Sequence, residues 1–154
     1  MTSSNHILKG TCFCGSVSYA LSAPPVLSAY CHCTNCQRLK GCPFVHTVHF
    51  DASAFRWTHA EPHYDHLHAY PIPDKPHKTR YRCKNCGACV ASHNSTKDKW
   101  SIWGVHLERT SEGKIKDWNV VKPTAHIFYG TRILDIEDSL GKWEGYEGDS
   151  GRIR

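Results

Sequence analysis

Apolar and polar residues alternate in short runs along this chain, which is the pattern of β-strands that bury one face. In residues 16–21, for example, Val17, Tyr19 and Leu21 fall on the same side of an extended chain. Glycine and proline between the runs mark turns. On this basis strands are predicted over residues 16–21, 26–30, 44–50, 55–58, 79–82, 90–93, 100–107, 125–129 and 132–134.

Helical periodicity is almost absent from the chain. One short helical turn is predicted over residues 34–40, ended by Gly41, because glycine readily takes the left-handed conformation that ends a helix. Residues 59–78 hold four prolines and five histidines, and prolines at this density prevent a helix. We therefore predict strand fragments around residues 64–70, a loop after them, and histidines that lie in solvent. Many short strands with so little helix predict an all-β antiparallel fold.

The length of 154 residues fits a single domain over residues 1–154. Its core is expected over about residues 7–134, and the acidic, Gly-rich end over about residues 135–154 is expected to be a surface tail. The charge is uneven, because residues 134–150 contain six acids and one base, for a net −5, against +10 for the rest. A basic body attracts anions, but no run of five basic residues occurs, so nucleic-acid binding is not expected.

The N-terminus and the hydropathy of the chain both favour a location inside the cell. Residues 1–6 are polar and lead into no apolar segment, so no secretory signal is expected. No apolar run approaches the roughly 18 residues of a membrane-spanning helix. Because thiols stay reduced in the cytosol, a cysteine-rich chain of this kind is expected to be cytoplasmic, with the nucleus as the alternative.

The nine cysteines are the most unusual part of the composition. Eight of them fall in three tight clusters, whereas the half-cystines of a disulfide scaffold are usually spread and even in number. Spacings of one and two residues are instead typical of zinc ligands. A redox C-x-x-C motif needs a βαβ context, which this chain lacks. The clusters are Cys12 and Cys14; Cys31, Cys33 and Cys36 (the triplet); and Cys83, Cys86 and Cys89, with Cys42 apart.

The spacing leaves open how these clusters share zinc ions. A structural zinc takes four protein ligands, so two clusters can combine into one closed site. That grouping is the quartet of Cys12, Cys14, Cys83 and Cys86. The alternative joins the triplet to one cysteine of the quartet. A triplet that binds zinc alone keeps one position of the tetrahedron for water or a substrate, and is then the functional site.

Four segments, in this order, resemble the glutathione-dependent formaldehyde-activating enzyme family, which includes centromere protein V. They are G-T-C-F-C-G at 10–15, C-H-C-T-N-C-Q-R at 31–38, C-K-N-C-G at 83–87 and P-T-A-H-I-F at 123–128. The resemblance implies the Mss4-like fold, in which antiparallel sheets form a tent-like arrangement around zinc. It also implies that the quartet holds a structural zinc, and that the triplet holds a second, catalytic zinc with an open position.

The activity that the resemblance implies is addition of the glutathione thiol to formaldehyde, which gives S-(hydroxymethyl)glutathione and is formally a carbon–sulfur lyase reaction in reverse. Three thiolates leave a Zn²⁺ centre at a formal charge of −1, so it polarises a carbonyl weakly but still holds an incoming thiol as thiolate. We therefore expect the triplet to present a thiolate nucleophile. The alternative is a non-catalytic two-zinc module that binds protein or nucleic acid, and a fourth protein ligand at the triplet would favour it.

Residues near the cysteine turns have more than one interpretation. Cys89, Cys42 or a histidine can supply a fourth ligand, although such a cysteine is more often a small buried apolar residue. His32 lies between two ligands and is expected to point away from the metal. Five basic residues flank the turns and can meet the carboxylates of glutathione or lie on the surface: Arg38, Lys40, Arg80, Arg82 and Lys84. Four aromatic residues are expected in the core: Trp100, Trp103, Phe128 and Tyr129.

Overall fold

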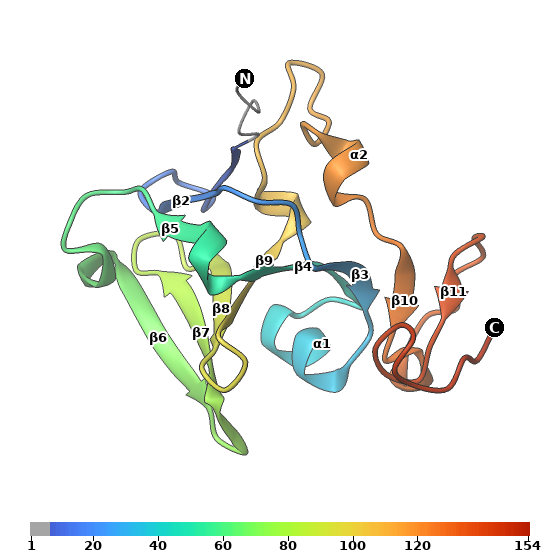
Figure 1. Cartoon of the computed structure of the whole chain (residues 1–154). Helices are drawn as coiled ribbons and strands as arrows, with labels where there is room; N and C mark the ends of the chain where they lie inside the picture. The colour runs from blue at the N-terminus through green and yellow to red at the C-terminus, as the bar shows by residue number, and fades with distance from the viewer. Residues whose placement is uncertain (1–6) are drawn as a thin grey trace.

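The computed structural model describes residues 7–154 and confirms the all-β prediction (Figure 1). The N-terminal segment 1–6, which was expected to carry no secretory signal, lies outside the described residues. One helix, α1 (Thr34–Lys40), ends at Gly41 in the left-handed conformation, as predicted. The other helical elements are α2 (Trp118–Val121) and 3₁₀ turns at Ala52–Ala54, His63–His66, Gly104–His106 and Tyr129–Thr131. No helix in residues 7–154 is long and apolar enough to cross a membrane.

The strands form two sheets. The smaller is antiparallel, in the order β1 (Leu8–Thr11), β2 (Ser18–Leu21) and β5 (Phe55–Trp57). The larger has eight strands in the order β11-β10-β3-β4-β9-β8-β7-β6, and is antiparallel except where β10 pairs in parallel with β3 and with β11. Its strands are β3 (Leu27–Cys31), β4 (Val45–Asp51), β6 (Leu67–Ile72), β7 (Lys75–Cys83), β8 (Cys89–Asn94), β9 (Lys99–Trp103), β10 (Ala125–Ile127) and β11 (Gly141–Lys142).

The main core joins the two sheets. Tyr19 of the small sheet and Phe50 of the large sheet are both almost fully buried in one hydrophobic cluster. Gly10 permits this packing, because a Cβ there would lie 2.3 Å from the ring of Tyr19. The expected core residues Trp100, Trp103 and Tyr129 are buried, and Phe128 is partly buried against a second, smaller cluster. That second cluster surrounds the triplet cysteines.

Five parts of the chain differ from the strand prediction. The loop expected after residue 70 is a hairpin of β6 and β7, because β6 lies at the sheet edge and Pro76 falls where the pairing shifts register. Residues 104–106 form a 3₁₀ turn rather than continuing β9. Residues 132–134 form no strand. The short strands β1 and β11 were not predicted.

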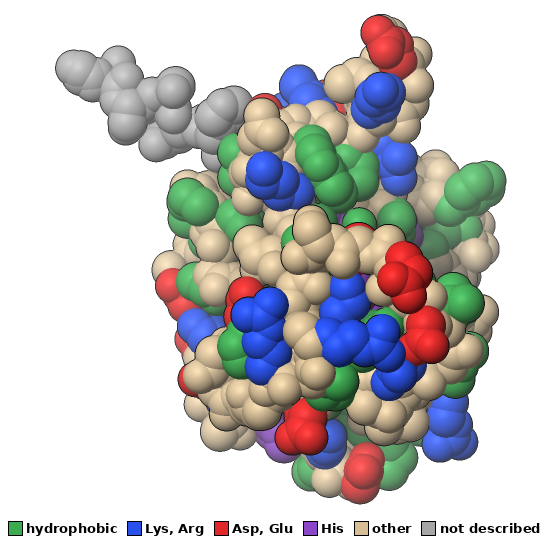
Figure 2. Space-filling view, turned by 90° about the vertical axis from the view of Figure 1, so that its right-hand side faces the viewer, with side chains coloured by type: hydrophobic (Ala, Val, Ile, Leu, Met, Phe, Trp, Pro, Cys, Tyr) green, Lys and Arg blue, Asp and Glu red, His purple; other side chains and the backbone are tan. Residues whose placement is uncertain are grey.

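The acidic C-terminal segment was expected to be a surface tail, but part of it belongs to the larger sheet. Its strand β11 pairs with β10, and Lys142 in that strand is 4% exposed. On the face that carries this segment, acidic and basic side chains lie beside one another (Figure 2). Asp135, for example, forms ion pairs with Arg132 and Arg154. Asp135 and Asp138 of this segment therefore pair with basic residues.

Candidate metal centres and functional site

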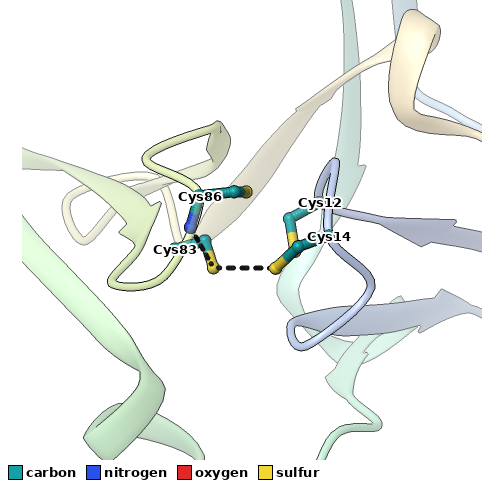
Figure 3. A group of neighbouring side chains, drawn as sticks. All are labelled: Cys12, Cys14, Cys83 and Cys86. Carbon is teal, nitrogen blue, oxygen red and sulfur yellow. Dashed lines mark hydrogen bonds between the residues drawn. The ribbon is translucent and has the colours of Figure 1, made fainter.

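The quartet brings together two turns that lie far apart in the sequence. Cys12 and Cys14 follow β1, whereas Cys83 ends β7 and Cys86 lies in the turn before β8 (Figure 3). The four sulfurs lie within 4.8 Å of one another, with 3.6 Å between Cys12 and Cys14 and 3.8 Å between Cys14 and Cys83. Sulfurs placed about 2.3 Å from a tetrahedral zinc lie about 3.8 Å apart, so the quartet fits such an ion.

Backbone geometry turns these thiols toward one another. Gly15 and Gly87 have φ values of 85° and 78°, a conformation that glycine adopts without steric cost. The sulfur of Cys83 accepts hydrogen bonds from the backbone N–H groups of Asn85 and Cys86, at 3.3 and 3.4 Å. A hydrogen bond with Ser16 lowers the pKa of Cys14 to about 5. The two turns thus bring the four thiols together, and the pKa values of Cys14 and Cys83 are lowered whereas burial raises that of Cys12.

The triplet is assembled within six residues. Cys31 ends β3, Cys33 is the N-cap of α1, and Cys36 lies in the first turn of that helix. The sulfur of Cys33 accepts the backbone N–H of Cys36 at 3.3 Å, which fixes two of the three thiols relative to each other. The three sulfurs lie within 4.8 Å of one another.

The triplet gains no fourth ligand from the part of the chain that the structure covers. No other His, Cys, Asp or Glu among residues 7–154 joins its group of ligand atoms. Cys42 instead donates a hydrogen bond to the backbone oxygen of Phe44 at 3.4 Å, and Cys89 packs against the cluster around the triplet. The quartet therefore offers four candidate ligands, whereas the triplet offers three.

The charges of the triplet thiols depend on one another. Hydrogen bonds with Cys31 and Cys36 hold the pKa of Cys33 well below its usual value, and those with Cys33 and Cys36 raise the pKa of Cys31. Three thiols this close cannot all ionise without a cation, because each thiolate disfavours the next. The chemistry of the triplet therefore fits a metal ion that neutralises three thiolates at once.

A polar network, which the sequence did not predict, lies behind the triplet and is buried except at Asp138. His32 is fully buried, and its Nε2 lies 2.8 Å from Nδ1 of His126, so it points away from the triplet as expected. Nε2 of His126 donates to Asp138 at 2.8 Å, and Lys142 donates to the same carboxylate at 2.5 Å. Burial alone would raise the pKa of Asp138, but these hydrogen bonds outweigh it and lower the pKa to about 2.

This network determines which nitrogens of the two histidines carry protons. Because the carboxylate of Asp138 accepts from Nε2 of His126, Nδ1 of a neutral His126 accepts the hydrogen bond from His32. The chain between Cys31 and Cys33 is thereby attached to the C-terminal segment. No signal in the sequence pointed to this contact, because the P-T-A-H-I-F segment indicated only the family resemblance.

Several cations and an aromatic ring lie near the triplet. Nζ of Lys40 lies 3.3 Å from the ring centroid of Trp103, and the guanidinium of Arg80 lies 5.5 Å from it. The positive charge of Arg80 helps to lower the pKa of Cys33, and Lys78 interacts electrostatically with the same thiol. Burial raises the pKa of the Tyr146 hydroxyl, and the negative charges of the three triplet thiolates raise it further. Sequence spacing indicated Lys40 and Arg80 but not Lys78 or Tyr146.

The remaining candidate residues lie elsewhere. The histidines of residues 59–77 form no candidate metal group within the described chain; His59 instead contacts the rings of His63 and His66. Three of the basic residues that flank the turns are exposed: Arg38, Arg82 and Lys84.

Stability should fall as the pH drops below neutral. Burial lowers the pKa of His32, His49 and His106 to about 4. An unfolded histidine has a pKa of about 6.5, so the unfolded chain takes up protons first, and the stabilising contribution is complete above that pH and lost toward pH 4. Urea unfolding at pH 7.5 and 5.5 measures the loss. Between these two pH values a His106→Gln variant should lose less of its free energy of unfolding than the parent protein does, with zinc content measured at each pH. An equal loss in both proteins would contradict the contribution assigned to His106.

The sequence pattern of glutathione-dependent formaldehyde-activating enzymes matches residues 7–131, which include both the quartet and the triplet. The chain belongs to the glutathione-dependent formaldehyde-activating enzyme family. Among solved structures, the crystal structure of a Rhodobacter sphaeroides protein from a structural genomics programme is similar, with a TM-score of 0.48 and 20% identity over 70% of this chain and 96% of that chain. No curated protein sequence matches the chain.

Membership in the glutathione-dependent formaldehyde-activating enzyme family supports an activity related to glutathione and formaldehyde. The part of the chain beyond the matched span is nevertheless close to the triplet. Asp138 and Lys142 complete the network that reaches His32, and Tyr146 responds to the charges of the triplet thiols. The surroundings of the triplet therefore include residues that lie outside the part shared with the family.

Proposed function

We propose that this protein is a zinc-dependent enzyme of the carbon–sulfur lyase type that acts on a glutathione adduct, namely S-(hydroxymethyl)glutathione formed from glutathione and formaldehyde. The observation that carries the proposal is the difference between the two cysteine groups: four ligands in the quartet and three in the triplet. A set of four closes a tetrahedral zinc, and a set of three leaves one position open. The proposed roles are a structural zinc at the quartet and a catalytic zinc at the triplet.

The residues of the triplet fit this role. A zinc ion held by Cys31, Cys33 and Cys36 would supply a position at which a bound thiol stays deprotonated at neutral pH. Cys31 and Cys36 are buried and shield one side of the triplet from water. Cys33 is partly exposed, so a substrate would reach the triplet from the side of Cys33. The positive charge of Arg80 acts on the thiols of Cys33 and Cys36 and favours their anionic forms.

The reaction balances without a further co-reactant. A bond forms between the sulfur of glutathione and the carbon of formaldehyde, and the carbonyl oxygen takes the proton that the thiol has lost. The reverse reaction breaks the same carbon–sulfur bond. We further propose that residues 1–154 act as one domain in the cytoplasm, where thiols are reduced and glutathione is abundant. The network between His32 and Asp138 supports this domain assignment, because it ties the C-terminal segment to the triplet.

The test replaces zinc by cobalt, whose absorption reports the number of thiolate ligands. Titration with glutathione should strengthen the sulfur-to-cobalt charge-transfer band, because the glutathione thiolate completes the triplet. S-methylglutathione, which carries no free thiol, is the matched control and should leave the band unchanged. In parallel, exchange NMR should show that the zinc protein accelerates interconversion of glutathione and S-(hydroxymethyl)glutathione.

A different result would overturn the proposal. If glutathione changes neither the cobalt spectrum nor the exchange rate, the triplet is not a thiol-binding catalytic site. The protein would then be a non-catalytic two-zinc module, and binding of protein or nucleic acid would become the function to examine.

A further inference from the structure

Two cations share one aromatic ring beside the triplet. Lys40 and Arg80 both approach Trp103, with Nζ of Lys40 at 3.3 Å and the Arg80 guanidinium carbon at 5.5 Å from the ring centroid. Lys40 lies one helical turn after Cys36 and therefore on the same face of α1. Two like charges gathered at one ring repel each other, so the arrangement is favourable only when negative charge lies nearby.

The negative charge does not come from acidic side chains. Within residues 7–154 no salt bridge joins Lys40, Lys78 or Arg80 to an Asp or Glu. Lys40 donates to the backbone oxygen of Cys89 at 2.8 Å. Nε of Arg80 is buried and has no hydrogen-bond partner in the described structure. A buried donor without a partner is costly, and an acceptor brought by a ligand would relieve that cost.

The triplet itself balances only part of this charge. Three thiolates and one Zn²⁺ carry a formal charge of −1, whereas Lys40, Lys78 and Arg80 together carry +3. Burial lowers the pKa of Lys40 to about 8, and it remains mainly cationic at neutral pH. The surroundings of the triplet therefore keep an excess of positive charge that suits an anionic ligand.

We propose that Lys40 and Arg80 form a carboxylate-binding subsite beside the triplet, which selects thiols that carry a carboxylate over neutral thiols. This inference rests on the proposed function, because it takes the triplet as the position of the substrate sulfur. Arg80 offers the planar donor group that pairs with a carboxylate, and Lys40 adds a point charge. Lys78 lies two residues from Arg80 along β7, on the same face of the strand, and adds to the attraction.

The test compares glutathione with glutathione diethyl ester, which keeps the thiol and loses both carboxylate charges. Binding is measured by the charge-transfer band of the cobalt-substituted protein. The parent protein should bind glutathione more tightly than the ester. Arg80→Gln should weaken glutathione binding roughly tenfold or more, as expected for loss of a charge-assisted hydrogen bond, and should weaken binding of the ester less, because the ester feels only the loss of the Arg80 charge at the triplet thiols. Lys40→Gln should act in the same direction.

Lys84→Gln is the matched control, because Lys84 is an exposed cation that flanks a cysteine turn and has no contact with Trp103. It should bind both ligands as the parent does. Circular dichroism and metal content show whether each variant is folded, and Arg80→Lys keeps the charge if Arg80→Gln does not fold. If the parent binds glutathione and its ester equally, this inference is wrong while the proposed function stands. If neither thiol binds, the proposed function itself fails.

Discussion

A Cys83→Ser variant will be largely unfolded at neutral pH and will not retain zinc at the quartet. Cys83 is buried, its sulfur lies 3.8 Å from that of Cys14, and it also accepts two backbone hydrogen bonds. Structural zinc binding contributes about 10–16 kcal/mol to folding, which is as large as the whole stability of a typical domain, about 5–15 kcal/mol. Circular dichroism and zinc quantification on the purified variant measure both effects.

Cys42→Ser is the control for this experiment, because Cys42 belongs to neither candidate metal group. It should keep the zinc content and the unfolding midpoint of the parent within the small range of a conservative substitution. A Cys83→Ser protein that remains folded and unfolds cooperatively at the parent's midpoint would show that the quartet does not hold the fold together.

A Cys33→Ser variant will remain folded, lose one zinc per chain and catalyse no faster than the uncatalysed reaction. Cys33 is only partly buried, and it belongs to a set of three ligands within six residues, so its loss removes a metal site without separating distant strands. Zinc content, circular dichroism and exchange NMR of glutathione with formaldehyde give the three readouts.

Cys89→Ser is the matched control, since Cys89 packs near the triplet without joining its ligand group. It should keep both zinc ions and the parent's exchange rate. If Cys33→Ser instead keeps its thiol-dependent turnover and the second zinc, the triplet is not the catalytic site. If Cys89→Ser loses the second zinc, Cys89 is a ligand and the triplet is a closed site.

The local parts of the fold and of the site could be predicted from the sequence. The alternation of apolar residues in the sequence located β2 and β4, although the structure buries both faces of these strands over most of their length. The C-x-x-C-G spacing indicates the turn at Cys83, because the whole motif lies within residues 83–87 and needs no distant contact. Pro76 misled the prediction, because a proline is tolerated where strand pairing is irregular and the sequence does not show where that occurs.

The long-range parts could not be predicted. The bond between His32 and His126 joins residues 94 positions apart, and neither histidine carries a spacing signal that points to the other. Tyr146 reaches the surroundings of the triplet only because β11 pairs with β10, and a two-residue strand leaves no periodic pattern. The grouping of the cysteines also depended on tertiary structure, since spacing alone allowed the triplet to share a ligand with the quartet.

The sequence separation within the two cysteine groups sets the order in which a growing chain can acquire its metal ions. The triplet is complete once residue 36 has been synthesised, whereas the quartet must wait for Cys86, 50 residues later. At about 5–20 residues per second this delay is about 3–10 seconds. During that interval Cys12 and Cys14 have no quartet partners and would compete for a zinc ion bound at the proposed triplet site. The nascent chain can therefore form the grouping in which the triplet shares a cysteine with the quartet, which is absent among the described residues of the folded structure. Once β7 and the turn after it have been synthesised, Cys83 and Cys86 can join Cys12 and Cys14 in the quartet.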